Sequence, residues 1–370
     1  MGSSAEPPPV VRFATFNTSL HREHAGQLVA ELRAAVDGSV SEQVAAVLAI
    51  IAVNDPDVLL INEFDHDDHQ AARYFARLAG YEYHFVAPSN TGLPAGVDLH
   101  GDGVVGPDDT FGFGAHPGQF GMLVLSRHRI GAEEVRTFQR FRWIDMPDAL
   151  LPTNPDGSPY YTEEALAVFR LSSKSHWDLP IHTPLGPVHL LASHPTPPAF
   201  DGPERRNAAR NHDEIRFWVD YVSGPEVAHY IQDDEGQAGG LRPGVPFVVA
   251  GDQNADPDDR GSIAGAIDRL LRHPRINTSV TPASAGAVEA AGPERVGRSA
   301  HHTADFAHPD LGGPGNLRVD YVLPSHELAI VDAGVFWPPS PDPQSALTGT
   351  FPFPASDHRL VWVDVSVDRR

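Results

Sequence analysis

The chain contains no cysteine, and this absence removes several kinds of chemistry at once. Without cysteine a protein has no disulfide, no thiolate metal site and no cysteine nucleophile. Any metal or catalytic site must therefore use oxygen and nitrogen donors. Because disulfides are what would mark an oxidising compartment, their absence leaves the compartment undetermined.

A long apolar run is also missing. No stretch approaches the roughly 20 apolar residues that a membrane-spanning helix needs, so we expect no membrane span. The first ten residues, MGSSAEPPPV, lack the basic and apolar regions of a secretory signal. We interpret residues 1–10 as a flexible lead-in. Secretion of a processed form is compatible with the sequence, which leaves the localisation and the oligomeric state open.

Basic residues are scarce relative to acidic ones. The chain has 27 Lys and Arg against 49 Asp and Glu, a formal net charge of -22. This balance disfavours broad electrostatic binding to nucleic acid or to an anionic membrane, because both are polyanions. It does not exclude a phosphate group that is held through a metal ion.

Three familiar signatures are absent as well. The sequence has no GxSxG elbow, no Walker loop and no GxGxxG fingerprint. A serine nucleophile of the hydrolase type and a bound nucleotide cofactor therefore have no support.

The 370 residues are 41 % hydrophobic, which is enough for one large domain or two ordinary ones. The first third alternates strand and helix patterns, as in βαβ units, and later strands follow in closer succession. Ser41 is expected to cap a helix that runs to about Val53. The predicted strands lie at 12–17, 57–63, 81–86, 121–126, 134–138, 167–173, 188–192, around 247, and at 319–323, 329–335 and 360–367; the predicted helices lie at 41–53, 67–78, 204–221 and 261–271.

Three segments fit neither pattern: 88–120, 143–161 and 282–316. Their richness in glycine, proline or alanine indicates surface insertions. None of them is distinct enough to be an interdomain linker, and the chain shows no internal repeat. We therefore expect a single domain over 11–370 with three elaborated loops.

The end of the apolar strand near Phe247 is the most informative point in the sequence. Alternate residues of an extended chain point to the same side, so Asp252 and Asn254 can present two oxygens to one ion or phosphate. Gly251 lets the backbone approach closely. An EF-hand reading of this segment fails, because Pro257 stands where that loop needs glycine and Ile263 where it needs glutamate.

Polar side chains close or precede other strands in the same way. Glu63 ends one apolar strand, and Asn17 and His194 end two more. Asp357 and His358 precede the last strand. Oxygen donors without thiolate suit Mg²⁺ best, and Mn²⁺ or Ca²⁺ fit the same donors. Taken alone, each acid also fits a solvated turn residue, and His194 fits a structural turn histidine.

Two further segments place charged or titratable side chains in or next to a predicted strand. Asp320 lies inside an otherwise apolar strand, and a buried carboxylate needs a partner, for which His358 is the candidate. A surface-facing Asp320 on an alternating strand is the alternative. Lys174 and His176 lie in the segment 172–177, which fits a phosphate-binding strand end and a merely polar strand end equally well.

Six short segments in this order resemble the endonuclease/exonuclease/phosphatase superfamily, the deoxyribonuclease-like group of metal-dependent phosphoesterases. The resemblance spans nearly the whole chain. It implies an α/β fold in the form of a four-layered sandwich, with two mixed β-sheets packed face to face and helices outside. The segments are 13–17, 60–63, 193–194, 251–254, 319–322 and 356–358.

The resemblance also implies a role for each matching residue. Glu63 would bind the divalent metal with help from Asp357, and Asn17 would hold metal or phosphate. Asp252 would orient or deprotonate the attacking water, and Asn254 would steady the phosphate.

Three more roles follow from the same resemblance. His358 would contact the phosphoryl oxygens, with its ring fixed by Asp320. His194 would assist the leaving oxygen. One departure is Gln253, which stands where the family commonly has an apolar or aromatic residue.

The expected activity is therefore hydrolysis of a phosphodiester or phosphomonoester by in-line attack of an activated water, with a divalent cation as cofactor. The negative charge favours a small or lipid-like phosphate ester over duplex DNA. The alternatives are a nuclease acting on DNA or RNA, and a non-catalytic module of the same fold that binds phosphate or calcium.

Overall fold

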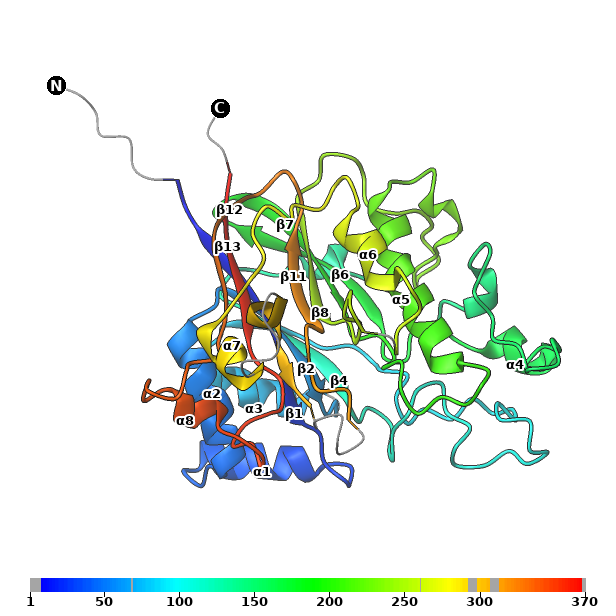
Figure 1. Cartoon of the computed structure of the whole chain (residues 1–370), viewed down its shortest axis with the longest axis horizontal. Helices are drawn as coiled ribbons and strands as arrows, with labels where there is room; N and C mark the ends of the chain where they lie inside the picture. Colours follow the sequence, from blue (N-terminus) through cyan, green and yellow to red (C-terminus); the bar gives the residue numbers. More distant parts are fainter. Residues whose placement is uncertain (1–7, 68, 260, 292–297, 307–312, 368–370) are drawn as a thin grey trace.

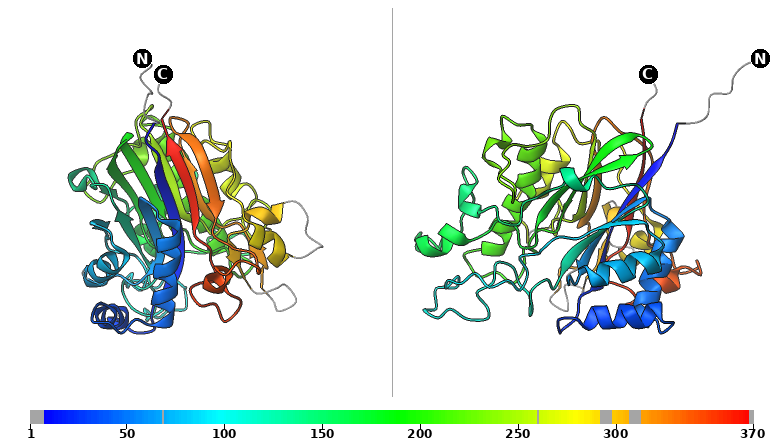
Figure 2. Two further views of the ribbon diagram at one scale, coloured as in Figure 1. Left: turned by 90° about the vertical axis from the view of Figure 1, so that its left-hand side faces the viewer. Right: turned by 180° about the vertical axis from the view of Figure 1, so that it is seen from behind.

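Two mixed β-sheets lie face to face at the centre of the computed structural model, and helices lie outside them (Figures 1 and 2). The structure describes residues 8–67, 69–259, 261–291, 298–306 and 313–367. Most of the predicted lead-in and two stretches of the predicted insertion 282–316 lie outside the described residues. The predicted four-layered sandwich is confirmed.

The first sheet has six strands, of which β1 and β2 are parallel neighbours near its middle. The remaining neighbours in this sheet are antiparallel. The order across the sheet is β12 (Ala329–Val335), β13 (Val361–Ser366), β1 (Val11–Leu20), β2 (Val58–Phe64), β4 (Gly121–Ser126) and β3 (Tyr83–Phe85).

The second sheet has five strands and again contains one parallel pair, β7 and β8. A separate antiparallel pair, β9 (Ala304–Asp305) and β10 (Asn316–Leu317), comes just before β11 in the sequence. The order across the second sheet is β11 (Asp320–Pro324), β8 (Phe247–Asp252), β7 (Gly186–Ser193), β6 (His176–Thr183) and β5 (Arg136–Thr137).

The helices divide between the two outer faces. Helices α1 (Gln27–Val36), α2 (Glu42–Asn54) and α3 (Gln70–Ala79) pack on the first sheet. Helices α5 (Arg206–Val222) and α6 (Ala266–Leu271) pack on the second. Three short helices lie in connections: α4 (Glu163–Val168), α7 (Ala285–Ala291) and α8 (Ser345–Thr348).

The alternation of side chains along the strands produces three apolar layers. On β1, Phe13 faces the other sheet whereas Ala14 and Phe16 face the helices. On β8, Val248 faces the first sheet and Val249 faces α5. Period-two patterning therefore builds one core between the sheets and one under each helix layer.

Most predicted elements are present, some with identical bounds. The strands at 121–126 and 329–335 are confirmed, and Ser41 caps α2 by accepting the N–H of Val44 at 3.4 Å. The predicted strand over 167–173 is wrong. There α4 runs to Val168, and the following carbonyls of Arg170 and Leu171 accept from the Arg210 guanidinium of α5.

Several elements were not predicted, α1 and β6 among them. Helix α1 begins after a residue with no side-chain cap, so its sequence carries no start signal. Strand β6 contains a proline and two histidines among its apolar residues, which obscures the strand pattern. Among the described residues, no helix combines the length and apolarity needed to cross a membrane.

The predicted insertions contribute buried side chains to the helix-side core of the second sheet. Leu99 and Phe111 come from 88–120, and Trp143 and Tyr161 bound 143–161. Asp213 of α5 holds the second insertion by accepting the Trp143 Nε1–H at 2.7 Å and the Leu150 N–H at 2.6 Å. These loops are therefore packed against the sandwich.

Candidate functional site

The strand topology brings the predicted residues to one edge of the sandwich. The parallel pairs β1–β2 and β7–β8 both end there (Figure 1). In the first sheet Asn17 pairs with Asn62, the residue before Glu63. In the second, Asp320 pairs with Asp252 across the antiparallel ladder of β11 and β8.

Asp252 lies at the centre of this edge and is buried. Its Oδ2 accepts from Asn17 Nδ2 at 3.1 Å, a bond that joins the two sheets. Its Oδ1 accepts the N–H of Asn254 at 2.9 Å, and its own N–H donates to Asn62 Oδ1 at 3.1 Å. The carboxylate is therefore held in a fixed orientation from both sheets.

Two histidines face the same oxygen of Asp252. His194 Nε2 lies 3.4 Å from Oδ2, and His358 Nε2 lies 3.8 Å from it. Burial tends to raise the pKa of Asp252, but the charge of His358 and the interactions with His194 lower it below its ordinary value. Asp252 is therefore ionised at neutral pH.

His358 is oriented by Asp320. Its Nδ1 lies 2.9 Å from Asp320 Oδ2, and that oxygen also accepts from Thr303 Oγ1 at 2.7 Å. Burial tends to lower the pKa of His358, but the carboxylates of Asp320 and Asp252 raise it well above the ordinary value. Burial raises the pKa of Asp320 to about 6, against the opposing effect of His358. The pair presents a cationic Nε2–H toward Asp252.

His194 has the opposite electrostatic character. Burial lowers its pKa, and the nearby charge of Lys174 lowers it further. Its Nδ1 is buried and has no hydrogen-bond partner among the described residues. A neutral ring that donates through Nε2 and keeps a free Nδ1 can accept a proton or a hydrogen bond from an incoming group.

Glu63 is placed differently from the buried group. It adopts a left-handed backbone conformation with φ of 57° at the end of β2, which is uncommon for a residue other than glycine and is often found at functional positions. Its side chain keeps 23 % exposure and lies 3.5 Å from His21 Nε2. Glu63 is therefore an accessible carboxylate beside the enclosed one.

The donors at this edge fit a hard divalent cation. Asp252, Asp320 and His358 offer ligand atoms within 4.8 Å of one another, and Asp320 Oδ1 is buried without a partner among the described residues. Glu63 adds an accessible carboxylate. His358 Nδ1 and Asp320 Oδ2 already bind each other, whereas Glu63 is accessible, so Glu63 is the residue of this edge that could hold a metal ion.

Two more predicted site residues, Asn254 and Lys174, lie near Asp252. Asn254 has φ of 50° and donates its Nδ2–H to the carbonyl of Pro195 at 3.0 Å. Lys174 is buried, and its pKa is lowered by burial against the opposing charges of Glu214, Glu63 and Asp252. Both therefore lie among the loops that surround Asp252.

The structure does not bring His176 into that group. Its Nε2 lies 2.9 Å from the carbonyl of Glu214, its Nδ1 bonds Ser172, and its ring packs on Phe217 and Trp218. These contacts are those of a core histidine. Asp357 is half-buried, and its carbonyl accepts from Asp305 N at 2.8 Å, while its carboxylate adds negative charge near His358.

Three residues of the site were missed in the sequence. Asn62 holds the N–H of Asp252, Thr303 holds Asp320, and His21 faces Glu63. Asn62 carried a signal, because it precedes Glu63 in an apolar strand. Thr303 lies inside a predicted insertion, and His21 directly follows β1, so neither had a pattern of its own.

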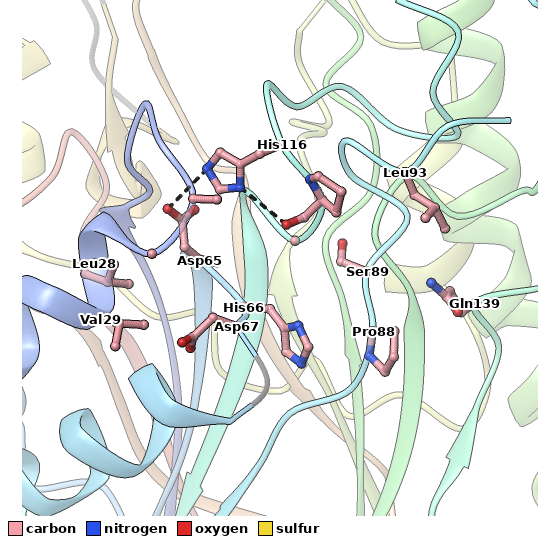
Figure 3. A pocket seen from close by; sticks show the side chains of 14 residues that line it. Leu28, Val29, Asp65, His66, Asp67, Pro88, Ser89, Leu93, His116 and Gln139 are labelled. Carbon is pink, nitrogen blue, oxygen red and sulfur yellow. Dashed lines mark hydrogen bonds and ion pairs between the residues drawn. The ribbon is translucent and has the colours of Figure 1, made fainter. Parts of the chain in front are cut away.

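A cavity of about 330 Å³ lies next to the loop that follows Glu63 (Figure 3). Asp65 and His116 lie at its wall 3.8 Å apart, with Leu28 and Val29 of α1 opposite the loop of Pro88. Asp65 accepts the backbone N–H groups of Arg22 at 2.8 Å and Phe120 at 3.2 Å. None of the residues around Asp252 lines this cavity.

The chain is a sandwich of two mixed sheets that gathers carboxylates, amides and histidines at one edge. The model of the Endonuclease/Exonuclease/phosphatase family matches residues 14–358. The chain belongs to that family, whose members are generally divalent-metal-dependent nucleases and phosphatases.

Solved structures agree on the fold. An endonuclease/exonuclease/phosphatase from Beutenbergia cavernae DSM 12333 aligns at a TM-score of 0.52 and 18 % identity, covering 97 % of this chain and 72 % of that one. The human Nocturnin catalytic domain with bound sulfate anion aligns at 0.50 and 15 % identity, covering 98 % and 96 %. No curated protein sequence matches significantly.

Proposed function

We propose that this protein is a divalent-metal-dependent phosphoesterase that hydrolyses a phosphodiester or phosphomonoester by in-line attack of water. The observation that carries the proposal is the ionised, buried Asp252 between two histidines of opposite character. Hydrolysis of a phosphate ester needs an oriented water, compensation for charge on the phosphoryl oxygens, and a proton for the leaving oxygen.

Asp252 orients the attacking water. Its lowered pKa keeps it ionised, but a carboxylate of low pKa is also a weak base, so it aligns the water more than it removes the proton. A bound divalent cation, held by Glu63 with Asn17 and Asp357 near it, would lower the pKa of a bound water and offset phosphate charge.

The cationic side chains compensate the charge that gathers on the phosphoryl oxygens. His358 presents a protonated Nε2 beside Asp252, and Asp320 prevents its ring from turning away. Lys174 is buried near them, where burial lowers its pKa and the charges of Glu214, Glu63 and Asp252 oppose that by favouring its cationic form. Asn254 supplies an uncharged amide on the same loop as Asp252. These groups are fixed before substrate arrives, which is the condition for electrostatic catalysis.

His194 is the candidate proton donor or hydrogen-bond donor for the leaving oxygen. It lies on the loop after β7, beside Asp252 and within the electrostatic influence of Glu63. Its lowered pKa favours a neutral ring, whose single N–H, on Nε2 beside Asp252, would donate the hydrogen bond to the leaving oxygen.

We propose a small or lipid-like phosphate ester as substrate. The net charge of -22 would repel a long polyanion, although a cation bridging protein and phosphate reduces that repulsion locally. A nuclease activity on DNA or RNA is the second candidate, since the family includes nucleases.

A calcium-binding structural module has less support. The nearby carboxylates that an oxygen cage would need are already engaged. Asp256 accepts the N–H groups of Asp258 at 2.7 Å and Arg318 at 2.6 Å, and both oxygens of Asp258 lie 2.8 Å from Arg298 Nη1.

The test is a substrate panel assayed with Mg²⁺, Mn²⁺, Ca²⁺ or EDTA. The panel contains bis(p-nitrophenyl) phosphate, p-nitrophenyl phosphate and plasmid DNA, and compares wild type with Asp252→Ala and His358→Ala. We expect metal-dependent turnover that both substitutions abolish. Turnover that survives both substitutions, or none on any substrate, contradicts the proposed function.

A further inference from the structure

Helix α5 buries an unusual run of polar side chains under the second sheet. Arg210, Asn211, His212, Asp213 and Glu214 are all buried on a helix whose other buried residues are mostly aromatic and aliphatic. A buried polar group without a partner is costly, so each of these must find one. The partners show that α5 is bonded to the loops of the proposed active site.

Glu214 connects the two loops that carry Lys174 and His194. One carboxylate oxygen accepts the N–H of Ser173 at 2.7 Å, and the other accepts the N–H of Thr196 at 2.6 Å. Ser173 directly precedes Lys174, and Thr196 follows His194 by two residues. One rigid side chain therefore sets the separation between these loops.

Asn211, one turn earlier on α5, makes the second connection. Its Nδ2 donates to the carbonyl of Thr196 at 2.8 Å and to the carbonyl of Gln253 at 2.9 Å. Gln253 lies between Asp252 and Asn254. The loop after β7 is thus tied to the loop after β8 by one amide.

Helix α5 is hydrogen-bonded to every segment that carries one of three residues of the proposed active site. Lys174, His194 and Asp252 lie on three separate segments, and α5 bonds all three through two adjacent turns (Figure 2 shows this layer from two sides). We infer that Glu214 and Asn211 are positioning residues, which fix the relative placement of Lys174, His194 and Asp252. This inference rests on the proposed function.

Glu214 also supplies charge. Lys174 is surrounded by Glu214 on α5, Glu63 on β2 and Asp252 on β8, and it faces the positive charges of Arg210 and, when protonated, His194. Because Lys174 is buried, a neighbouring carboxylate favours its cationic form. The same side chain therefore places the loop of Lys174 and stabilises its charge.

Asp213 provides a matched control. It is adjacent in sequence, equally buried, and also accepts two N–H groups, but these belong to Trp143 and Leu150 of the insertion 143–161. Glu214→Gln replaces one acceptor by a donor and must break one loop bond. Asp213→Ala removes more hydrogen bonds than Glu214→Gln but leaves the catalytic loops tied.

The experiment measures kcat and KM on the best substrate of the panel, with correction for the folded fraction. We expect Glu214→Gln to lower kcat on the order of 10- to 100-fold with little change in KM, as misplacement of catalytic groups does. Asp213→Ala should lower the melting temperature at least as much and leave kcat within about threefold of wild type. If Asp213→Ala does not fold, Asp213→Asn serves as the control in its place.

Hydrogen exchange gives a readout that does not need activity. Glu214→Gln should accelerate exchange at the amide of Ser173 or of Thr196, whichever loses its acceptor, and Asp213→Ala should accelerate it at the amide of Leu150. Equal kcat in both variants, or unchanged exchange at Ser173 and Thr196, overturns the inference while the proposed function stands. A wild type without turnover on any phosphate ester overturns the proposed function itself.

Discussion

Helices α2 and α5 cover the two sheets from opposite sides, but they bury different chemistry. Helix α2 buries Val44, Val47, Ile50 and Ile51 against the first sheet, and its one buried polar residue is Asn54. Within the described part of the chain, the Nδ2 of Asn54 donates to Ile50 O of its own helix, at 2.8 Å. The buried face of helix α2 therefore supports its sheet by apolar packing, while the half-buried Gln43 donates to the carbonyls of Ser19 at 3.0 Å and Ala355 at 2.9 Å.

Helix α5 uses part of its buried surface for hydrogen bonds to loops. Glu214 and Asn211 bind the loops that carry Lys174, His194 and Asp252, and Arg210 donates to the carbonyls of Leu171 and Phe111. Apolar packing is tolerant of small shifts, whereas a hydrogen bond fixes a distance and an angle. Helix α5 therefore binds the loops of Lys174, His194 and Asp252 through buried side chains, whereas α2 reaches the chain after Asn17 and before His358 through one half-buried side chain, Gln43.

The largest expected effect comes from Asp252, which lies in the second sheet and is hydrogen-bonded to the first. Asp252→Asn keeps the size of the side chain but removes the charge that orients water and faces His358. We expect a loss of kcat of about 10³-fold or more, at unchanged secondary structure by circular dichroism. A variant that retains a tenth of wild-type kcat would show that the catalytic centre lies elsewhere.

The second expected effect is that the α5 side of the molecule loses more stability in acid than the α2 side. Burial lowers the pKa of His176, which packs on α5, to about 4, below its value of about 6.5 in the unfolded chain. A group with a depressed folded pKa contributes stability that is present above the unfolded pKa and lost as pH falls through the folded one. The window therefore runs from about pH 6.5 to about 4.

Over that window we expect a loss of about 3 kcal/mol from this group. The measurement is urea unfolding of wild type and His176→Gln at pH 7 and pH 4.5. The variant should start less stable and lose less on acidification. Hydrogen exchange at pH 4.5 should weaken protection in α5 before α2; the reverse order would contradict the contrast between the helices.

The third effect compares two buried asparagines. Asn211→Ala frees the carbonyls of Thr196 and Gln253 and should lower kcat on the order of 10-fold. Asn54→Ala removes a bond within α2 and should cost about 1 kcal/mol of stability without changing kcat. The pair is assayed by denaturant unfolding and steady-state kinetics. Similar kcat values for both variants would remove the distinction between the two helices.

The sequence predicted the fold and much of the edge because the signals were local. Strand ends that carry Asn17, Glu63, Asp252 and His358 are visible as apolar runs followed by polar residues, and their order led to the family and the four-layered sandwich, both confirmed. The structure brings Asn17, His194, Asp320 and His358 to Asp252. Their catalytic roles stay predictions.

What the sequence could not reveal depends on contacts between distant segments. Thr303 approaches Asp320 only after the chain folds, and His21 reaches Glu63 only because β1 and β2 are neighbours. The predicted strand at 167–173 failed because Arg210, far along the chain, takes the carbonyls that a strand partner would need. His176 looked like part of a phosphate site but packs in the core.

The most direct test of the account is a crystal structure with Mn²⁺ and inorganic phosphate, using anomalous scattering to locate the metal. We predict a peak with Glu63 oxygen at about 2 to 2.6 Å, and phosphate oxygens facing His358, His194 and Asn254. A metal that binds only at Asp256 or Asp258, with no density beside Glu63, would contradict the assignment of this edge as the catalytic site.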